Sequence, residues 1–211
     1  MKTLRNLVFG SLLATPAWAE PVTIAALGDS LTQGYGLQVE DGFVQQLGAW
    51  LQAAGADVAM INAGVSGDTT AGGLSRIDWT LTPEVDAVIV ALGGNDVLRG
   101  LSPEEARKNL SGILDKVSAK GLPVLLVGLD VPSNYGADYE TAFEAVYTDL
   151  AAKYGTLFFP NFLAGLTDLG DMALVLREHM QRDGIHPDAS GVALIVEAMG
   201  PRVLELVETA Q

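Results

Sequence analysis

The stretch Ala25-Ala26-Leu27-Gly28-Asp29-Ser30-Leu31-Thr32-Gln33-Gly34-Tyr35-Gly36 joins an apolar run to a polar, glycine-rich turn. The apolar run begins at Val22 and is typical of a strand that is buried on both faces. Ligands of open α/β sheets bind at the carboxyl ends of the strands, so Ser30 stands where a nucleophile would be useful. Taken alone, Gly-Asp-Ser is also typical of an ordinary turn. The rest of the chain decides between these two interpretations.

Helical and strand patterns alternate along the chain after Ser30. The strands are continuously apolar, which is typical of a parallel sheet covered on both faces. Right-handed crossovers then predict an α/β fold, a doubly wound three-layer α/β/α sandwich. The long span 160–187 is expected to contain a short helix near 172–180. The expected strands after the first are 57–61, 86–92, 122–129 and 156–159, and the expected helices are 41–54, 68–81, 103–120, 138–154 and 190–208.

Composition narrows the class of protein. The chain has 211 residues, 49% of them hydrophobic, which is the size of one globular domain with an ample core. It has no cysteine, so disulfides, thiolate zinc sites and a cysteine nucleophile are excluded. A formal charge of −14 argues against nucleic acid as a partner, because phosphate backbones would be repelled.

Residues 1–19 have the pattern of a secretory signal peptide. Lys2 and Arg5 form a charged start, residues 7–14 form a short apolar core, and Ala17-Trp18-Ala19 is a small-x-small cleavage site. The segment is too short for a transmembrane helix, which needs about 20 apolar residues. We therefore expect a single folded domain over 20–211, located in the periplasm or secreted, with no transmembrane segment in the mature chain.

Three further polar stretches resemble the turn at Ser30 in composition. Asn62-Ala63-Gly64-Val65-Ser66-Gly67 follows the second expected strand, and Gly93-Gly94-Asn95-Asp96 follows the third. Asp183-Gly184-Ile185-His186-Pro187 lies just before the last helix. The carboxyl ends of parallel strands share one edge of a sheet, so the loops that follow the strands are expected to meet there.

These stretches contain the groups that acyl transfer needs: a nucleophile, a base, a carboxylate that orients the base, and donors for the oxyanion. Asp183 and His186 are three residues apart in a tight turn, so the carboxylate can accept from one imidazole nitrogen and leave the other free. We expect Ser30 as nucleophile, His186 as base and Asp183 as the orienting acid. The expected oxyanion donors are the Gly64 backbone N–H, the Asn95 side-chain amide and the N–H of Ser30 itself.

In four ordered blocks the sequence resembles the GDSL, or SGNH, hydrolase family. The blocks are Gly28-Asp29-Ser30-Leu31, Gly64 within 62–70, Gly93-Gly94-Asn95-Asp96 and Asp183-Gly184-Ile185-His186-Pro187. The resemblance covers about Val22 to Glu208. It implies a flavodoxin-like five-stranded sheet, a Ser-His-Asp triad, and no metal or cofactor.

Within this family the chain is most similar to the bacterial exported acyl-CoA thioesterases, lysophospholipases and arylesterases. Its size, its N-terminal segment, Gly34-Tyr35-Gly36 and Asn134-Tyr135-Gly136 support that placement. The resemblance implies hydrolysis of carboxylic esters and thioesters through an acyl-enzyme. The partner is then a small-molecule acyl ester or thioester, lysophospholipid included, and the span 162–180 is expected to help line the acyl pocket.

Two other functions fit the same fold. A carbohydrate O-deacetylase would have a shallow, polar cleft that accepts acetyl groups and no longer acyl chains. A non-catalytic binding protein is disfavoured, because such a protein has no physical reason to keep Ser30, Asp183 and His186 together.

Two residues compete with the assigned nucleophile and base. Ser66 lies in Gly64-Val65-Ser66-Gly67-Asp68, which lacks the final glycine of a G-x-S-x-G elbow, and is therefore expected to be an ordinary loop residue. His179 is the one other histidine of the chain and is expected at the surface or at the rim of the pocket.

Overall fold

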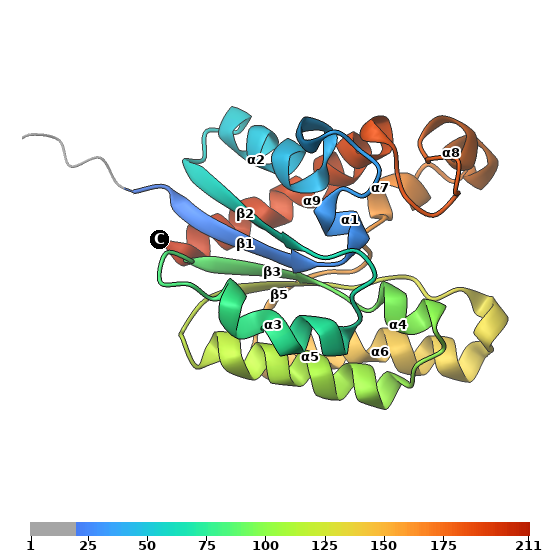
Figure 1. Ribbon diagram of the computed structural model, residues 1–211, viewed down its shortest axis with the longest axis horizontal. Helices are drawn as coiled ribbons and strands as arrows, with labels where there is room; N and C mark the ends of the chain where they lie inside the picture. Colours follow the sequence, from blue (N-terminus) through green and yellow to red (C-terminus); the bar gives the residue numbers. More distant parts are fainter. Residues whose placement is uncertain (1–19) are drawn as a thin grey trace, which may run out of the picture.

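The computed structural model describes residues 20–211, and the signal peptide expected over 1–19 lies outside this part. A five-stranded, entirely parallel sheet has the strand order β2-β1-β3-β4-β5 (Figure 1). The doubly wound sandwich and the flavodoxin-like order are therefore confirmed, and the domain boundary at Glu20 stays a prediction. The strands are β1 (Val22–Gly28), β2 (Val58–Gly64), β3 (Ala87–Ala91), β4 (Val124–Val127) and β5 (Leu157–Phe159).

Helices cover both faces of the sheet (Figure 1). On one face lie α1 (Ser30–Gln33), α2 (Phe43–Ala53), α7 (Ala164–Thr167), α8 (Met172–Glu178) and α9 (Ala189–Ala210). On the other lie α3 (Thr70–Thr80), α4 (Gly94–Leu98), α5 (Pro103–Ser118) and α6 (Ala137–Tyr154). Two 3₁₀ turns, η1 (Val39–Asp41) and η2 (Ser133–Tyr135), complete the elements. The short helix expected near 172–180 is confirmed as α8.

The two cores explain why the strands are continuously apolar. In β1, Ile24 and Ala26 pack into the core beneath α2 and α9, whereas Ala25 and Leu27 pack into the core beneath α3, α5 and α6. All four side chains are fully buried. Successive residues of a strand point to opposite faces, so a strand covered on both faces has no polar side to present.

Local signals place the ends of the long helices correctly. Ser102 Oγ accepts from Glu105 N (3.2 Å) at the start of α5, and Pro103 occupies the first helical position. Gly155, in the left-handed conformation, ends α6. The helices α1, α4 and α7 were not expected, because four or five residues are too few to show a 3.6-residue period.

The carboxyl ends of the neighbouring strands β2, β1 and β3 lie level with one another. Gly28, the last residue of β1, pairs with Gly64 of β2 and with Ala91 of β3. The loops that follow these strands therefore leave the sheet together, at the end of the molecule where α4, α7 and α8 lie (Figure 1). Between residues 20 and 211, no helix has the length and apolar composition needed to cross a membrane.

Candidate active site

Ser30 is the first residue of α1, directly after β1, as expected from the strand-end pattern. Asp29 caps this helix, because its Oδ1 accepts from Leu31 N (3.0 Å). Ser30 Oγ faces His186 and donates to its Nε2 (2.9 Å). The polar turn at Gly28-Asp29-Ser30 thus places a serine hydroxyl beside an imidazole that lies 156 residues later in the chain.

Asp183 orients the ring of His186. His186 Nδ1 donates to Asp183 Oδ2 (2.7 Å), and the backbone N–H groups of Ile185 and His186 donate to Asp183 Oδ1 (2.9 and 3.0 Å). The carboxylate can only accept, so the ring hydrogen lies on Nδ1 and the Nε2 lone pair faces Ser30. The hydrogen bonds from His186 and Ile185 lower the pKa of Asp183 to about 2, which keeps this carboxylate ionised.

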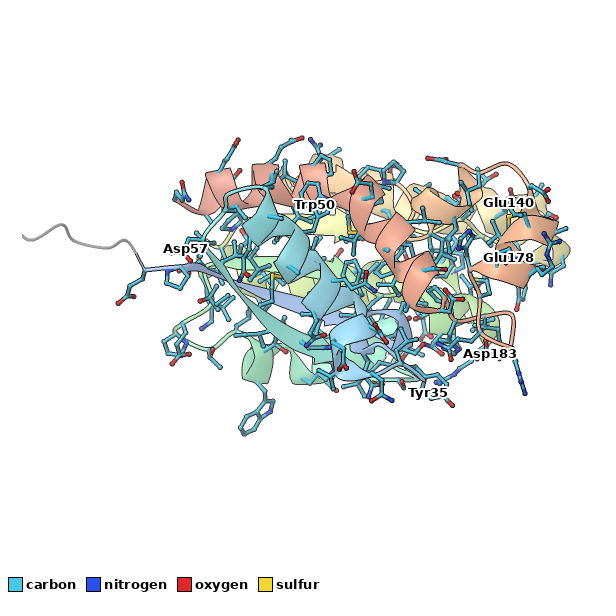
Figure 2. The ribbon with its side chains drawn as sticks, turned by 90° about the horizontal axis from the view of Figure 1, so that it is seen from above. Tyr35, Trp50, Asp57, Glu140, Glu178 and Asp183 are labelled. Carbon is cyan, nitrogen blue, oxygen red and sulfur yellow. The ribbon has the colours of Figure 1, made fainter. Side chains whose placement is uncertain are left out.

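The site lies at the carboxyl edge of the sheet. Figure 2 shows Tyr35 and Asp183 at one end of the molecule, and Asp57, which immediately precedes β2, toward the other. The ring of Tyr35 packs against the imidazole of His186, with 4.7 Å between ring centroids and 40° between the planes. Ser30, Asp183 and His186 are therefore brought together as the sequence predicts.

Asn95 lies next to this group at the start of α4, and its Nδ2 donates to Asp29 Oδ2 (3.3 Å). The neighbouring Asp96 is buried and anchors the helix: its Oδ2 accepts from Thr70 N (2.8 Å) and its Oδ1 from Thr70 Oγ1 (2.6 Å). Gly93 precedes the helix with φ of 126°, a conformation that favours glycine. A Cβ at Gly93 would also meet the Tyr147 hydroxyl at 1.9 Å.

The structure does not bring Gly64 into the site. β2 continues through Gly64 instead of ending at Ile61 as expected, and the Gly64 N–H donates to Asn62 Oδ1 (2.9 Å). Gly64 is absent from the lining of the adjacent cavity, to which the later loop residues Ser66 and Gly67 contribute. The assignment of Gly64 as an oxyanion donor is therefore wrong. The sequence misled because the apolar pattern of the strand stops at Asn62, whereas its hydrogen bonding continues to Gly64.

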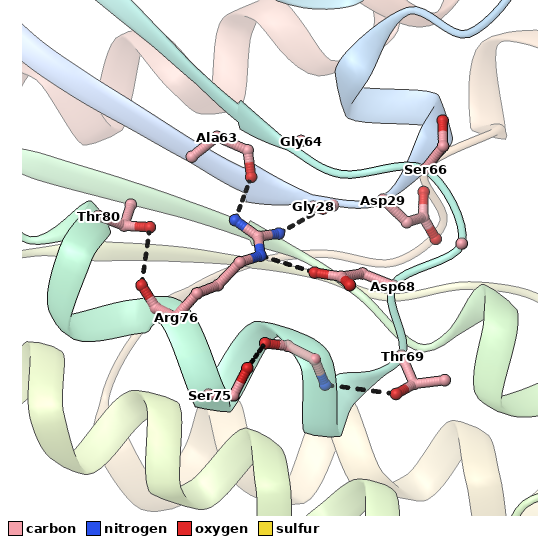
Figure 3. A network of polar contacts seen from close by, with 12 residues as sticks. Gly28, Asp29, Ala63, Gly64, Ser66, Asp68, Thr69, Ser75, Arg76 and Thr80 are labelled. Atoms are coloured by element: carbon pink, nitrogen blue, oxygen red, sulfur yellow. Dashed lines mark hydrogen bonds and ion pairs between the residues drawn. The ribbon is translucent and has the colours of Figure 1, made fainter.

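Arg76 fastens the ends of β1 and β2 to each other (Figure 3). Its guanidinium donates to Gly28 O (2.8 Å), Ala63 O (2.7 Å) and Asp68 Oδ2 (2.6 Å). The contact with Asp68 also fixes the loop that carries Gly67. Sequence reasoning missed this arginine, since its partners are mostly backbone carbonyls, which leave no pattern of side chains.

An apolar cavity of about 810 Å³ opens beside Ser30 and His186. Its lining comes from the carboxyl ends of β3 and β4, from the segments that follow all five strands, and from the turn that carries His186. Asp29, Asn95 and Asp130 are among its few polar residues. Phe162, Leu163 and Thr167 supply part of the wall, so the first part of the span 162–180 lines the cavity as expected and the rest of the span, with α8, does not. Other apolar lining residues include Leu31, Leu92, Leu98, Val127, Leu129 and Ile185.

The two rival residues have other partners. The Ser66 hydroxyl donates to Gln33 Oε1 and makes no contact with either histidine within the described chain. His179 Nδ1 contacts Ser190 Oγ (2.8 Å), whose hydroxyl bonds Asp188 Oδ1 (2.7 Å) at the start of α9. In this second Ser–His pair the carboxylate bonds the serine rather than the ring, so the imidazole is not oriented as a base.

Asp29 is a buried carboxyl group directly beside Ser30. Burial raises its pKa to about 6, opposed by the hydrogen bond from Leu31, the nearby His186 and the amide of Asn95. Between about pH 4 and pH 6 the folded protein therefore holds a proton that the unfolded chain has lost. Stability supplied by this group is full below this window and falls as the pH rises through it.

Replacing Asp29 with asparagine is expected to flatten that part of the pH dependence, because an amide does not titrate. The free energy of unfolding of Asp29→Asn, relative to the original protein, should rise by about 3 kcal/mol between about pH 4 and pH 7. Urea unfolding curves of both proteins at each pH measure this difference. Parallel pH dependences would contradict the buried, proton-holding state of Asp29.

Comparisons with known proteins show the family to which the chain is similar. A model of the GDSL-like Lipase/Acylhydrolase family matches residues 26–194. Esterase TesA of Pseudomonas aeruginosa is 39% identical over 88% of this chain and 89% of its own. The Arylesterase of Vibrio mimicus is 32% identical over 97% and 98% of the two chains. The Escherichia coli K12 protein named Thioesterase 1/protease 1/lysophospholipase L1 is 33% identical over 88% and 85%.

Solved structures give the same match in three dimensions. The crystal structure of AlinE4, an SGNH-hydrolase family esterase, is 43% identical and has a TM-score of 0.72 over 90% of this chain and 98% of its own. A crystal structure of TesA is 38% identical and has a TM-score of 0.78 over 87% and 99%.

Proposed function

The chain belongs to the GDSL-like lipase/acylhydrolase family, and from this premise we propose that Ser30, His186 and Asp183 act as the triad of a serine esterase. The protein is an ester hydrolase that acts on carboxylic esters and thioesters. The observation that carries the assignment of residues is the continuous hydrogen-bonded series from Ser30 Oγ through His186 to Asp183, at the mouth of an apolar cavity.

The chemistry follows from the positions of these atoms. His186 Nε2 takes the Ser30 hydroxyl proton as Oγ bonds the acyl carbon, and Asp183 stabilises the resulting imidazolium. The tetrahedral intermediate then breaks the bond to the alcohol or thiol, which leaves with the proton from Nε2. Water enters, gives a proton to Nε2 and attacks the acyl-enzyme. Release of the carboxylic acid returns that proton to Ser30 Oγ.

We propose three donors for the oxyanion: the backbone N–H groups of Ser30 and Gly67, and the side-chain amide of Asn95. Neither backbone N–H has an acceptor within the part of the chain that the structure describes, and both residues line the cavity. The Asn95 amide donates one hydrogen to Asp29, and its second hydrogen is available for the oxyanion. Gly67 replaces Gly64 in this role, because the N–H of Gly64 is bonded to Asn62.

Replacing Asn95 with alanine tests this oxyanion site. Loss of one such donor typically lowers kcat by roughly 10²–10³-fold. We expect Asn95→Ala to show that loss with little change in KM, because the amide acts on charge that develops only in the transition state. Steady-state kinetics on a p-nitrophenyl ester measures both constants. A variant with unchanged kcat would place the donors elsewhere.

The cavity favours acyl chains longer than acetyl. A carbohydrate O-deacetylase needs a shallow and polar cleft, whereas about 810 Å³ of mainly apolar space adjoins Ser30. Branched and aromatic side chains from the ends of β3 and β4 and from the surrounding loops form much of its lining, which suits an alkyl or aryl group. We therefore propose arylesters, acyl-CoA thioesters and lysophospholipids as the substrate classes, and the deacetylase as the weaker alternative.

A panel of substrates separates these proposals. The panel contains p-nitrophenyl esters from acetate to palmitate, acyl-CoA, lysophosphatidylcholine and acetylated sugars. The esterase proposal expects kcat/KM to rise from acetate to a longer chain and acetylated sugars to be poor substrates. A panel in which only acetyl groups are removed would support the deacetylase instead.

We propose further that the protein is exported and that the mature chain begins at Glu20. The support is the charged start, short apolar core and Ala17-Trp18-Ala19 site of residues 1–19. N-terminal sequencing of the protein from periplasm or medium tests this, and a mature chain that still begins with Met1 would contradict it.

A further inference from the structure

Gln181 lies between the loop that follows Ser30 and the turn that carries Asp183 and His186. Its side-chain Nε2 donates to Tyr35 O (2.7 Å) and to Pro187 O (3.0 Å), which uses both amide hydrogens. Its backbone N donates to His186 O (2.8 Å), and its carbonyl accepts from Gly184 N (3.0 Å). One residue thus closes the base of the turn and joins it to another part of the chain.

The same contacts continue to the nucleophile. Tyr35 N donates to Ser30 O (3.0 Å), so an unbroken series of hydrogen bonds runs from the backbone of Ser30 through Tyr35 and Gln181 to His186. The Tyr35 ring meanwhile packs on the imidazole at 4.7 Å between centroids. Two loops that are 146 residues apart in sequence are therefore held together on either side of the Ser30–His186 hydrogen bond.

Gly36 makes room for this arrangement. Its φ is +76°, and a Cβ at this position would lie 2.2 Å from Gln181 Oε1. Any side chain at residue 36 would therefore displace the amide of Gln181 or move the Tyr35 loop away from it. The motif Gly34-Tyr35-Gly36, which the triad and the oxyanion donors leave without a role, thus gains one as the receiving site for Gln181.

We propose that Gln181 is a positioning residue, which fixes His186 relative to Ser30 by binding the carbonyls of Tyr35 and Pro187. The inference rests on the proposed triad. Displacement of a reacting group by about 1 Å can cost 10²-fold in rate, so the bridge matters without touching substrate. Gln181 is absent from the cavity lining, so its loss should change kcat rather than KM.

The test compares Gln181→Met with Arg182→Met. Methionine keeps the length of glutamine and lacks its donors, and Arg182 is the exposed neighbouring residue, so the second variant is a matched control. Rates are divided by the number of active sites titrated with a p-nitrophenyl phosphonate, which removes any effect of unfolded protein. We expect kcat of Gln181→Met to fall roughly 10- to 100-fold with KM within about twofold, and Arg182→Met to retain its kcat.

A second variant reaches the same contact from the other loop. Gly36→Ala should lower kcat on its own and by a smaller factor in a Gln181→Ala background, where the shorter side chain removes the clash with the new methyl group and only the backbone strain at φ +76° remains. An unchanged kcat per titrated site in Gln181→Met, or fully additive effects of Gly36→Ala and Gln181→Ala, would overturn the inference. The triad itself is judged separately by Ser30→Ala, whose retention of activity would instead remove the proposed function.

Discussion

Alanine at position 30 should abolish turnover, with kcat falling by roughly four to six orders of magnitude. Ser30 Oγ is the hydroxyl that bonds the unprotonated nitrogen of His186 (2.9 Å), so alanine removes the atom that would attack the acyl carbon. The folded state should be unaffected, because Ser30 is only partly buried and its side chain makes no other hydrogen bond within 20–211. Hydrolysis of a p-nitrophenyl ester measures the loss.

A phosphonate inhibitor provides the matching observation on the unchanged protein. One equivalent should attach to the peptide that contains Ser30, as mass spectrometry of a digest would show. A label on Ser66, together with activity in Ser30→Ala, would contradict the assignment of the nucleophile.

The second large effect concerns the base. His186→Ala should lose hydrolysis almost completely, whereas His179→Ala should retain most of it, since His179 bonds Ser190 and does not line the cavity. Asp183→Asn should cost about 10⁴-fold, because an amide can favour the wrong tautomer of the imidazole. Initial rates of the three purified variants measure these differences.

Circular dichroism of the same samples confirms that they are folded. A folded His186→Ala with near-normal kcat would remove the triad. The low pKa of Asp183, about 2, adds a constraint: any loss of activity at mildly acidic pH must come from a group other than Asp183.

Much of the fold could be read from the sequence, because its signals are local and repeated. Apolar runs such as 86–92 have one stable placement, between two layers of helices, and Ser102-Pro103 marks a helix start without any tertiary contact. The triad could be predicted for a related reason: its three members follow turns whose glycines and polar residues stand out from apolar neighbours.

The errors and omissions lie where hydrogen bonds connect distant backbone atoms. β2 pairs with β1 as far as Gly64. The polar Asn62 interrupts the apolar pattern, so hydrophobicity alone predicts a shorter strand. Arg76 bonds the carbonyls of Gly28 and Ala63, and Gln181 bonds those of Tyr35 and Pro187. Every residue has the same backbone carbonyl, so hydrogen bonds to carbonyls cannot be predicted from residue composition or spacing.

The separation of Ser30 and His186 by 156 positions in the sequence also governs when the protein can become active. β1 is the first strand to be made but lies inside the sheet, between β2 and β3, and parallel pairings over such long connections form slowly. A nascent chain that has reached Asn95 possesses the nucleophile without a base. Hydrolytic activity can begin only when the last part of the chain has docked, so a chain that crosses a membrane before folding carries no active esterase with it on the way.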